Sequence, residues 1–199
     1  MHNCAIVILA AGNSSRLGNI KQLLSYNSQT LLEHVIDEAA KAQLNPIVAV
    51  TGAFENDVSK VINRQKAQIV FNDRWQEGMA SGIVAGISKV QLIDKDIENI
   101  IIAVCDQPFV TAVLFRQLIF KRKESGKNII ACSYAGTIGT PVLFNKKYFK
   151  KLLVLKGEEG AKKILRFCAD DIGVVAFPLG NIDIDTDEDY KKLIFLKYQ

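Results

Sequence analysis

The sequence is poor in the residues that build redox, metal and acyl-transfer sites. It has four cysteines, which lie too far apart to form a CxxC motif: Cys4, Cys105, Cys132 and Cys168. Its two histidines leave no visible serine, cysteine and histidine arrangement for acyl transfer. No apolar run approaches the roughly 20 residues that span a bilayer, and the first residues lack the pattern of a signal peptide. We therefore expect a cytoplasmic protein with reduced cysteines and no membrane partner.

Charge of one sign is not in large excess either. The 25 basic and 21 acidic residues leave a net charge of +4, and no dense basic tract is present. The nearest candidate, Lys121–Lys123, falls at the end of an expected helix, where cations interact favourably with the helix dipole. These features predict no nucleic-acid partner. Since 49% of the residues are hydrophobic and no linker-like or repeated segment interrupts them, we expect one domain over residues 1–199.

Apolar runs of strand length alternate with segments of helical period. The expected strands are Cys4–Ala10, Ile47–Thr51, Ala67–Phe71, Asn99–Val104, Asn128–Ser133, Pro141–Phe144 and Gly173–Phe177. The expected helices are Thr30–Ala42, Glu55–Asn63, Ala80–Val90, Thr111–Lys123, Gly160–Phe167 and Asp187–Leu196. Runs such as NIIIAV are apolar on both faces, which is typical of a parallel sheet covered by helices. The alternation predicts an α/β protein with three layers, α/β/α, and a mostly parallel, Rossmann-like sheet.

The first expected strand leads into a loop rich in small residues, within the stretch LAAGNSSRLGNIKQLL at Leu9–Leu24. Small residues let backbone N–H groups approach an anion, and Arg16 and Lys21 add full charges. Because ligands of open α/β sheets bind at the carboxyl ends of the strands, a phosphate is the natural occupant. The loop matches neither the Walker motif GxxxxGK[ST] nor the dinucleotide fingerprint GxGxxG. A surface loop with coincidental charges is the open alternative.

Acidic residues follow other expected strands. Asp106 comes directly after a buried strand and can reach a divalent cation, since Mg²⁺ favours one or two carboxylates plus substrate phosphates. The alternative is that Asp106 caps the helix that begins near Thr111. Asp183 and Asp185 lie on the same side of an extended segment, where they repel each other unless a cation sits between them. The acids that follow, Asp187–Asp189, suit the first turn of the last helix.

Together these segments resemble the MobA/MocA-like nucleotidyltransferases that act on the molybdenum cofactor, and more broadly the GT-A-type nucleotidyltransferases. LAAGNSSRLGNIKQLL is similar to the family signature LAxGxSxRMGxxK, CDQPF to the segment cDqPfv, and NIDIDTDEDYKKL to the closing DIDTpeD. NDRWQEGMASGIVAGI resembles the segment that contacts the base and ribose, within which we expect Trp75 to pack in the core. GTIGTPVLF and LKGEEGAKKIL resemble regions that face the pterin substrate. The resemblance implies a nucleotide-diphospho-sugar transferase or GT-A-like fold.

The resemblance also implies which residues form the site. A nucleoside triphosphate would be bound by Leu9, Ala10, Ala11, Gly12, Ser14, Ser15, Arg16, Lys21, Thr51, Gly52, Asn72, Gly78, Met79, Ser81 and Asp106. The implied catalytic residues are Arg16, Lys21 and Asp106. Mg²⁺ or Mn²⁺ would bind Asp106 together with Asp185, with Asp183 as the second candidate.

Within the family, AAG at Ala10–Gly12 favours the branch that uses CTP. The implied activity moves a nucleoside monophosphate from CTP to the phosphate of molybdopterin, releases pyrophosphate, and supplies a molybdoenzyme of the xanthine dehydrogenase type. Two alternatives stay open. One is a sugar-1-phosphate or alditol-phosphate nucleotidylyltransferase, and the other is a non-catalytic nucleotide-binding protein that delivers cofactor.

Overall fold

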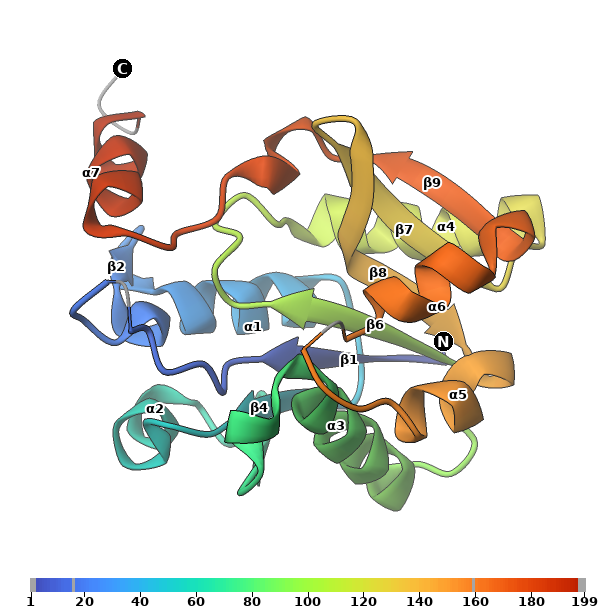
Figure 1. The fold of residues 1–199 in the computed structure, drawn as a ribbon, viewed down its shortest axis with the longest axis horizontal. Coiled ribbons are helices and arrows are strands. Elements are labelled where there is room, and N and C mark those ends of the chain that lie inside the picture. The colour runs from blue at the N-terminus through green and yellow to red at the C-terminus, as the bar shows by residue number, and fades with distance from the viewer. Residues whose placement is uncertain (1–2, 16, 159, 197–199) are drawn as a thin grey trace.

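The described part of the chain in this computed structural model, residues 3–15, 17–158 and 160–196, is built around a seven-stranded sheet (Figure 1). The strands are β1 (Cys4–Leu9), β4 (Ile47–Thr51), β5 (Gln68–Phe71), β6 (Asn99–Val104), β7 (Ile129–Tyr134), β8 (Thr137–Asn145) and β9 (Ile172–Ala176). Their spatial order is β5-β4-β1-β6-β8-β7-β9. Neighbouring strands are parallel except for β8, which runs antiparallel to β6 and β7. The expected mostly parallel sheet is confirmed.

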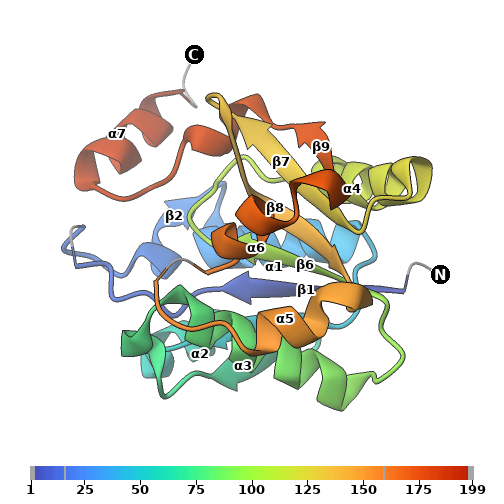
Figure 2. The same cartoon turned by 45° about the vertical axis from the view of Figure 1, so that its right-hand side comes forward.

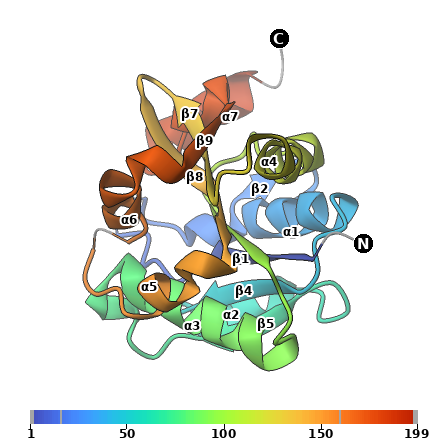
Figure 3. The ribbon, with the colours of Figure 1, turned by 90° about the vertical axis from the view of Figure 1, so that its right-hand side faces the viewer.

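Helices cover both faces of this sheet. They are α1 (Leu31–Lys41), α2 (Glu55–Val61), α3 (Met79–Ile93), α4 (Ala112–Ser125), α5 (Phe149–Leu153), α6 (Lys162–Phe167) and α7 (Asp187–Leu196). Buried side chains of α1, α2 and α4 join one apolar cluster, and those of α3, α5 and α6 join the cluster on the opposite face. Figure 3 shows these two layers with the sheet between them, which confirms the expected α/β/α architecture.

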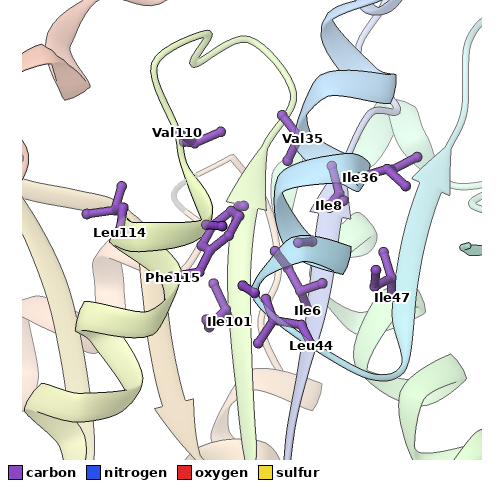
Figure 4. Packing of buried hydrophobic residues seen from close by; sticks show 14 of the residues in the cluster. Ile6, Ile8, Val35, Ile36, Leu44, Ile47, Ile101, Val110, Leu114 and Phe115 are labelled. Atoms are coloured by element: carbon purple, nitrogen blue, oxygen red, sulfur yellow. The ribbon is translucent and has the colours of Figure 1, made fainter.

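The alternation of side chains along β1 explains how one strand serves both layers. Ile6 and Ile8 pack with α1 and α4 in the first cluster (Figure 4), whereas Ala5 and Val7 pack in the second. On the second face α3 approaches β1 closely at Gly86, where an added Cβ would overlap the Val7 side chain. A glycine inside a helix costs up to about 1 kcal/mol relative to alanine, and here it permits close helix–sheet packing.

A short helix and a small hairpin were not predicted from the sequence, and the expected strand Pro141–Phe144 is longer than predicted. Helix α5 is a short helix that follows a 3-10 turn. Strands β2 (Ser25–Tyr26) and β3 (Gln29–Thr30) form a small hairpin with residues of positive φ in its turn. Ala135 and Gly136 both have positive φ and form a two-residue turn, which makes β8 return antiparallel to β7 and begin earlier than expected. The sequence has no Asn-Gly or Asp-Gly signal at either hairpin.

Helix α7 packs away from the sheet, against the hairpin. In Figures 1 and 2 it lies beside β2, and the Tyr190 hydroxyl donates a hydrogen bond of 3.0 Å to the Ser25 carbonyl. A third apolar cluster joins Leu193 of α7 and the buried Ile184 to Leu17 and Leu31. Since Leu17 belongs to the glycine-rich loop after β1, this cluster connects the end of the chain to that loop.

Asp171 joins three segments near the start of β9. Its carboxylate accepts hydrogen bonds from the Asn128 backbone and side chain, from the Lys147 ammonium at 2.8 Å and from the Tyr148 hydroxyl at 2.9 Å. Burial alone would raise the pKa of Asp171, but the hydrogen bonds outweigh burial and hold this pKa well below its usual range. The ionised carboxylate is therefore the form that stabilises the fold.

We expect Asp171→Asn to lower the free energy of unfolding at pH 7 by about 1.5–3 kcal/mol, the range for a hydrogen bond to a charged group. The wild-type advantage should be complete above pH ~4, the unfolded-state pKa of an aspartate, and should shrink as the pH falls further toward the lower folded-state pKa. Urea unfolding at several pH values measures this difference. Asp170→Asn is the matched control, because Asp170 is exposed and engages Lys127 through its backbone carbonyl. An equal loss of unfolding free energy in both variants would contradict the prediction.

Candidate active site

The carboxyl ends of β1 and β6 lie side by side, because Leu9 pairs with Val104 in the parallel register. The loop after β1 and the loop after β6 therefore meet at one edge of the sheet. A cavity of about 470 Å³ opens there. Twelve of the residues predicted for the site line it: Leu9, Ala10, Ala11, Gly12, Ser14, Ser15, Lys21, Asn72, Gly78, Met79, Asp106 and Asp185.

Three other predicted residues lie behind the cavity wall. Thr51 is fully buried and donates to the Val70 carbonyl, while Gly52 is pressed against Ala11 and Trp75, so neither lines the cavity as expected for contact with the base. Ser81 accepts a hydrogen bond from Asn72 and donates one to the Gly78 carbonyl, both at 2.8 Å. Ser81 thus fixes the turn that carries Gly78. Arg16 lies outside the described residues.

The Lys21 ammonium bonds two carboxylates that are far apart in the sequence. Its Nζ donates to Asp106 Oδ2 at 3.0 Å and to Asp185 Oδ1 at 2.6 Å. Burial by itself would lower the pKa of Lys21, but the two carboxylates outweigh burial and raise it. The lysine side chain is only 15% exposed, so this triad is partly withdrawn from water and each charge matters more than at an open surface. The cation and the two distant acids predicted for one site are therefore in contact.

Asp183 adds a third acid beside this triad. It does not line the cavity, and its residue surface is largely exposed. Partial desolvation of the carboxyl, followed by repulsion from Asp106 and Asp185, raises the pKa of Asp183 to about 6. Lys21 therefore lies among three acids, Asp106, Asp183 and Asp185.

The donor chemistry of this edge suits a divalent cation that a substrate helps to hold. Among the residues that the structure describes, no group of three or more histidine, cysteine, aspartate or glutamate side chains is arranged to hold a metal ion alone. Mg²⁺ does not require such a cage, because it commonly takes one or two carboxylates and completes its shell with water and phosphate oxygens. Asp106 and Asp185, held together by one cation, fit that requirement.

Sequence reasoning missed Gln22, which fixes the shape of the loop after β1. Its side chain is 2% exposed, and its Nε2 donates to the carbonyls of Ala10 at 2.8 Å and Gly12 at 3.0 Å. Ser14, which has a positive φ, accepts from the Lys21 backbone N–H through its hydroxyl at 2.9 Å. The sequence offered one sign of this role, since Gln22 precedes the apolar pair LL in the segment KQLL. A polar side chain that is buried there must find hydrogen-bond partners inside the protein.

Eight further residues line the cavity beyond those predicted for the site, among them Trp75, Gln76 and Glu158. Trp75 was expected in the core but borders the cavity, next to Gln76. Glu158 lies against Gly78, and the neighbouring Gly157 carbonyl accepts the Ala80 backbone N–H at the start of α3. Apart from Glu158, these residues are uncharged, whereas Lys21, Asp106 and Asp185 add charges to the lining. The cavity lining therefore has charged groups suited to a phosphate chain and uncharged groups suited to a neutral ring.

The fold and this site define a nucleotidyltransferase with a GT-A-like fold. The chain belongs to the family described as the MobA-like NTP transferase domain, which matches residues 6–172. None of the described helices is both long enough and apolar enough to cross a membrane.

Named relatives are similar along most of the chain. The purine catabolism protein PucB of Bacillus subtilis (strain 168) is 27% identical over 195 residues, which cover 92% of each protein. The molybdenum cofactor cytidylyltransferase of Escherichia coli (strain K12) is 28% identical over 141 residues, covering 70% of this chain and 69% of that protein. The crystal structure of Rv0371c from Mycobacterium tuberculosis H37Rv has a TM-score of 0.83 and 27% identity, and the likeness covers 96% of this chain and 97% of that one.

Proposed function

We propose that this protein transfers the cytidylyl group of CTP to the phosphate of a molybdopterin-type acceptor and releases pyrophosphate. The observation that carries the proposal is the contact of Lys21 with both Asp106 and Asp185 in a glycine-lined cavity. The E. coli relative named as a molybdenum cofactor cytidylyltransferase, together with AAG at Ala10–Gly12, supports CTP and the acceptor.

The protein residues would act by alignment and charge neutralisation. An oxygen of the acceptor phosphate attacks the α-phosphorus of CTP, and the bond from that phosphorus to the β-phosphate oxygen breaks. Lys21 and backbone N–H groups of the loop after β1 would bind the departing pyrophosphate. Asp106 and Asp185 would hold Mg²⁺ or Mn²⁺, which when bound neutralises charge on the phosphates. No protein nucleophile is needed, since holding the two reactants in line supplies much of the acceleration.

Thermal unfolding with each of the four nucleoside triphosphates plus Mg²⁺ tests the nucleotide. We expect CTP to raise the melting temperature most, because a ligand at 100 times its Kd adds about 2.7 kcal/mol of stability. An equal or larger shift with GTP or ATP would contradict the choice of CTP.

Turnover with purified molybdopterin cofactor tests the acceptor. Pyrophosphate should appear only when both CTP and the pterin are present. Release with a sugar-1-phosphate or an alditol phosphate in place of the pterin would favour a sugar-type nucleotidylyltransferase. CTP binding without pyrophosphate from any acceptor would indicate a non-catalytic delivery protein.

A further inference from the structure

Gln107, which follows Asp106 directly in the loop after β6, is buried. Its side chain is 1% exposed, and its Nε2 donates a hydrogen bond of 2.7 Å to the carbonyl of Gly180. Its Oε1 is also buried and has no hydrogen-bond partner among the described residues. A buried amide is costly unless it finds partners inside the protein. Besides the Gly180 carbonyl, the Gln107 side chain lies within hydrogen-bonding reach of the Asp183 carboxylate and the Tyr134 hydroxyl.

The hydrogen bond from Gln107 fixes the segment that carries the other two acids. Gly180 lies in the short 3-10 helix Pro178–Asn181, which leads directly into Asp183 and Asp185. On the far side of Asp183, the Ile184 backbone N–H donates to the Asp106 carbonyl at 3.0 Å. The loop after β6 therefore holds the closing segment at two points, one on each side of Asp183.

The first of these points is also fixed by shape. An added Cβ at Gly180 would overlap the ring of Tyr134, and one at Gly139 would overlap the same side chain. Tyr134 thus packs between two glycines, and Gly180 cannot approach β7 more closely. The second point is fixed by the Ile184 side chain, which is fully buried in the cluster with Leu193. From the Asp106 loop, the Gln107 side chain adds its hydrogen bond to Gly180 and lies next to Asp183 itself.

We infer that Gln107 is a positioning residue that sets the spacing between Asp106 and the acids Asp183 and Asp185. Through its hydrogen bond to Gly180, it holds the two acidic segments at the separation that Lys21 now bridges and that a divalent cation would bridge. The inference rests on the proposed function for the presence of that cation. Residues that orient metal-binding carboxylates typically change metal affinity or activity about 10- to 100-fold when replaced.

Gln107→Met tests the inference, because methionine has a similar length but cannot donate to Gly180. The first readout is Mn²⁺ affinity, measured by electron paramagnetic resonance of free Mn²⁺ with and without CTP and without acceptor. We expect affinity to fall about 10- to 100-fold. In turnover assays the kcat should fall while the KM for the nucleotide stays unchanged, since the loop after β1 is intact. Gln107→Leu, which also lacks the donor, is the second variant in case methionine prevents folding.

Asn128→Leu is the matched control, because Asn128 makes hydrogen bonds to Asp171 that also join distant segments but lie away from the acids. It should lower the melting temperature and leave Mn²⁺ affinity at the wild-type value. The inference is overturned if the Gln107 variants lose stability as the control does yet bind Mn²⁺ like the wild type, or if the wild type binds no Mn²⁺ in either condition. Weakened Mn²⁺ binding in the variants supports it even if CTP or the pterin proves to be the wrong substrate.

Discussion

Asp106→Asn is expected to lower kcat roughly 100- to 1,000-fold, the range seen when one preorganised electrostatic group is removed from an active site. Asparagine keeps the size of the side chain and can still contact Lys21 through its amide oxygen. It removes the negative charge that a divalent cation requires and that attracts the ammonium at 3.0 Å. Pyrophosphate release measures the effect, and circular dichroism should show an unchanged fold.

Asp187→Asn is the matched control for this variant. Asp187 is an exposed acid in the first turn of α7 whose carboxylate pairs with Lys191 at the surface, so its replacement should leave kcat at the wild-type value. If Asp106→Asn retains activity within tenfold of the wild type, the placement of Asp106 at the reacting phosphates is wrong. A protein that only delivers cofactor would also be insensitive to this change.

Lys21→Met should produce two effects of opposite direction. Nucleotide turnover should fall roughly 100- to 1,000-fold in kcat/KM, because the charged donor to the phosphates is lost. Mn²⁺ affinity without nucleotide should rise at least about tenfold, since the Lys21 ammonium competes with a metal ion for Asp106 and Asp185. Calorimetric Mn²⁺ titration and steady-state kinetics on the same preparation measure both.

Lys66→Met serves as the control for charge loss alone, because Lys66 forms a surface ion pair with Asp37 at 2.7 Å away from the cavity. It should change neither quantity. A Lys21→Met protein with weaker Mn²⁺ binding would indicate that the lysine organises the carboxylates rather than competing for them. That outcome would contradict the idea that a divalent cation replaces the Lys21 ammonium at the two carboxylates.

The parts of the fold that follow from local pattern were predictable from the sequence. The apolar run NIIIAV suits a strand that is buried on both faces of a sheet. It forms β6 over the predicted residues, Asn99–Val104. Thr30 and Glu33 form a capping box at the start of α1, and Thr111 caps α4 through the Leu114 N–H. These features depend on neighbours within a few residues.

What could not be predicted depends on contacts across the chain. Gln22 and Gln107 are amides in apolar surroundings, and their roles come from carbonyls that only the folded structure places beside them. The antiparallel direction of β8 comes from a turn at Ala135 and Gly136 whose positive φ values leave no strong sequence signal. The gathering of Asp106 with Asp185 was expected from the resemblance to the family, since Asp185 does not directly follow a strand of the sheet.

The most direct test of the central claim is a crystal structure with a non-hydrolysable CTP analogue and Mn²⁺. The account predicts anomalous scattering from Mn²⁺ beside Asp106, Asp185 and the phosphates. Lys21 should have moved from the two carboxylates to a phosphate oxygen, and the base should lie next to Gly78. A triphosphate bound elsewhere, or Mn²⁺ bound away from both aspartates while Lys21 keeps its two ion pairs, would contradict it.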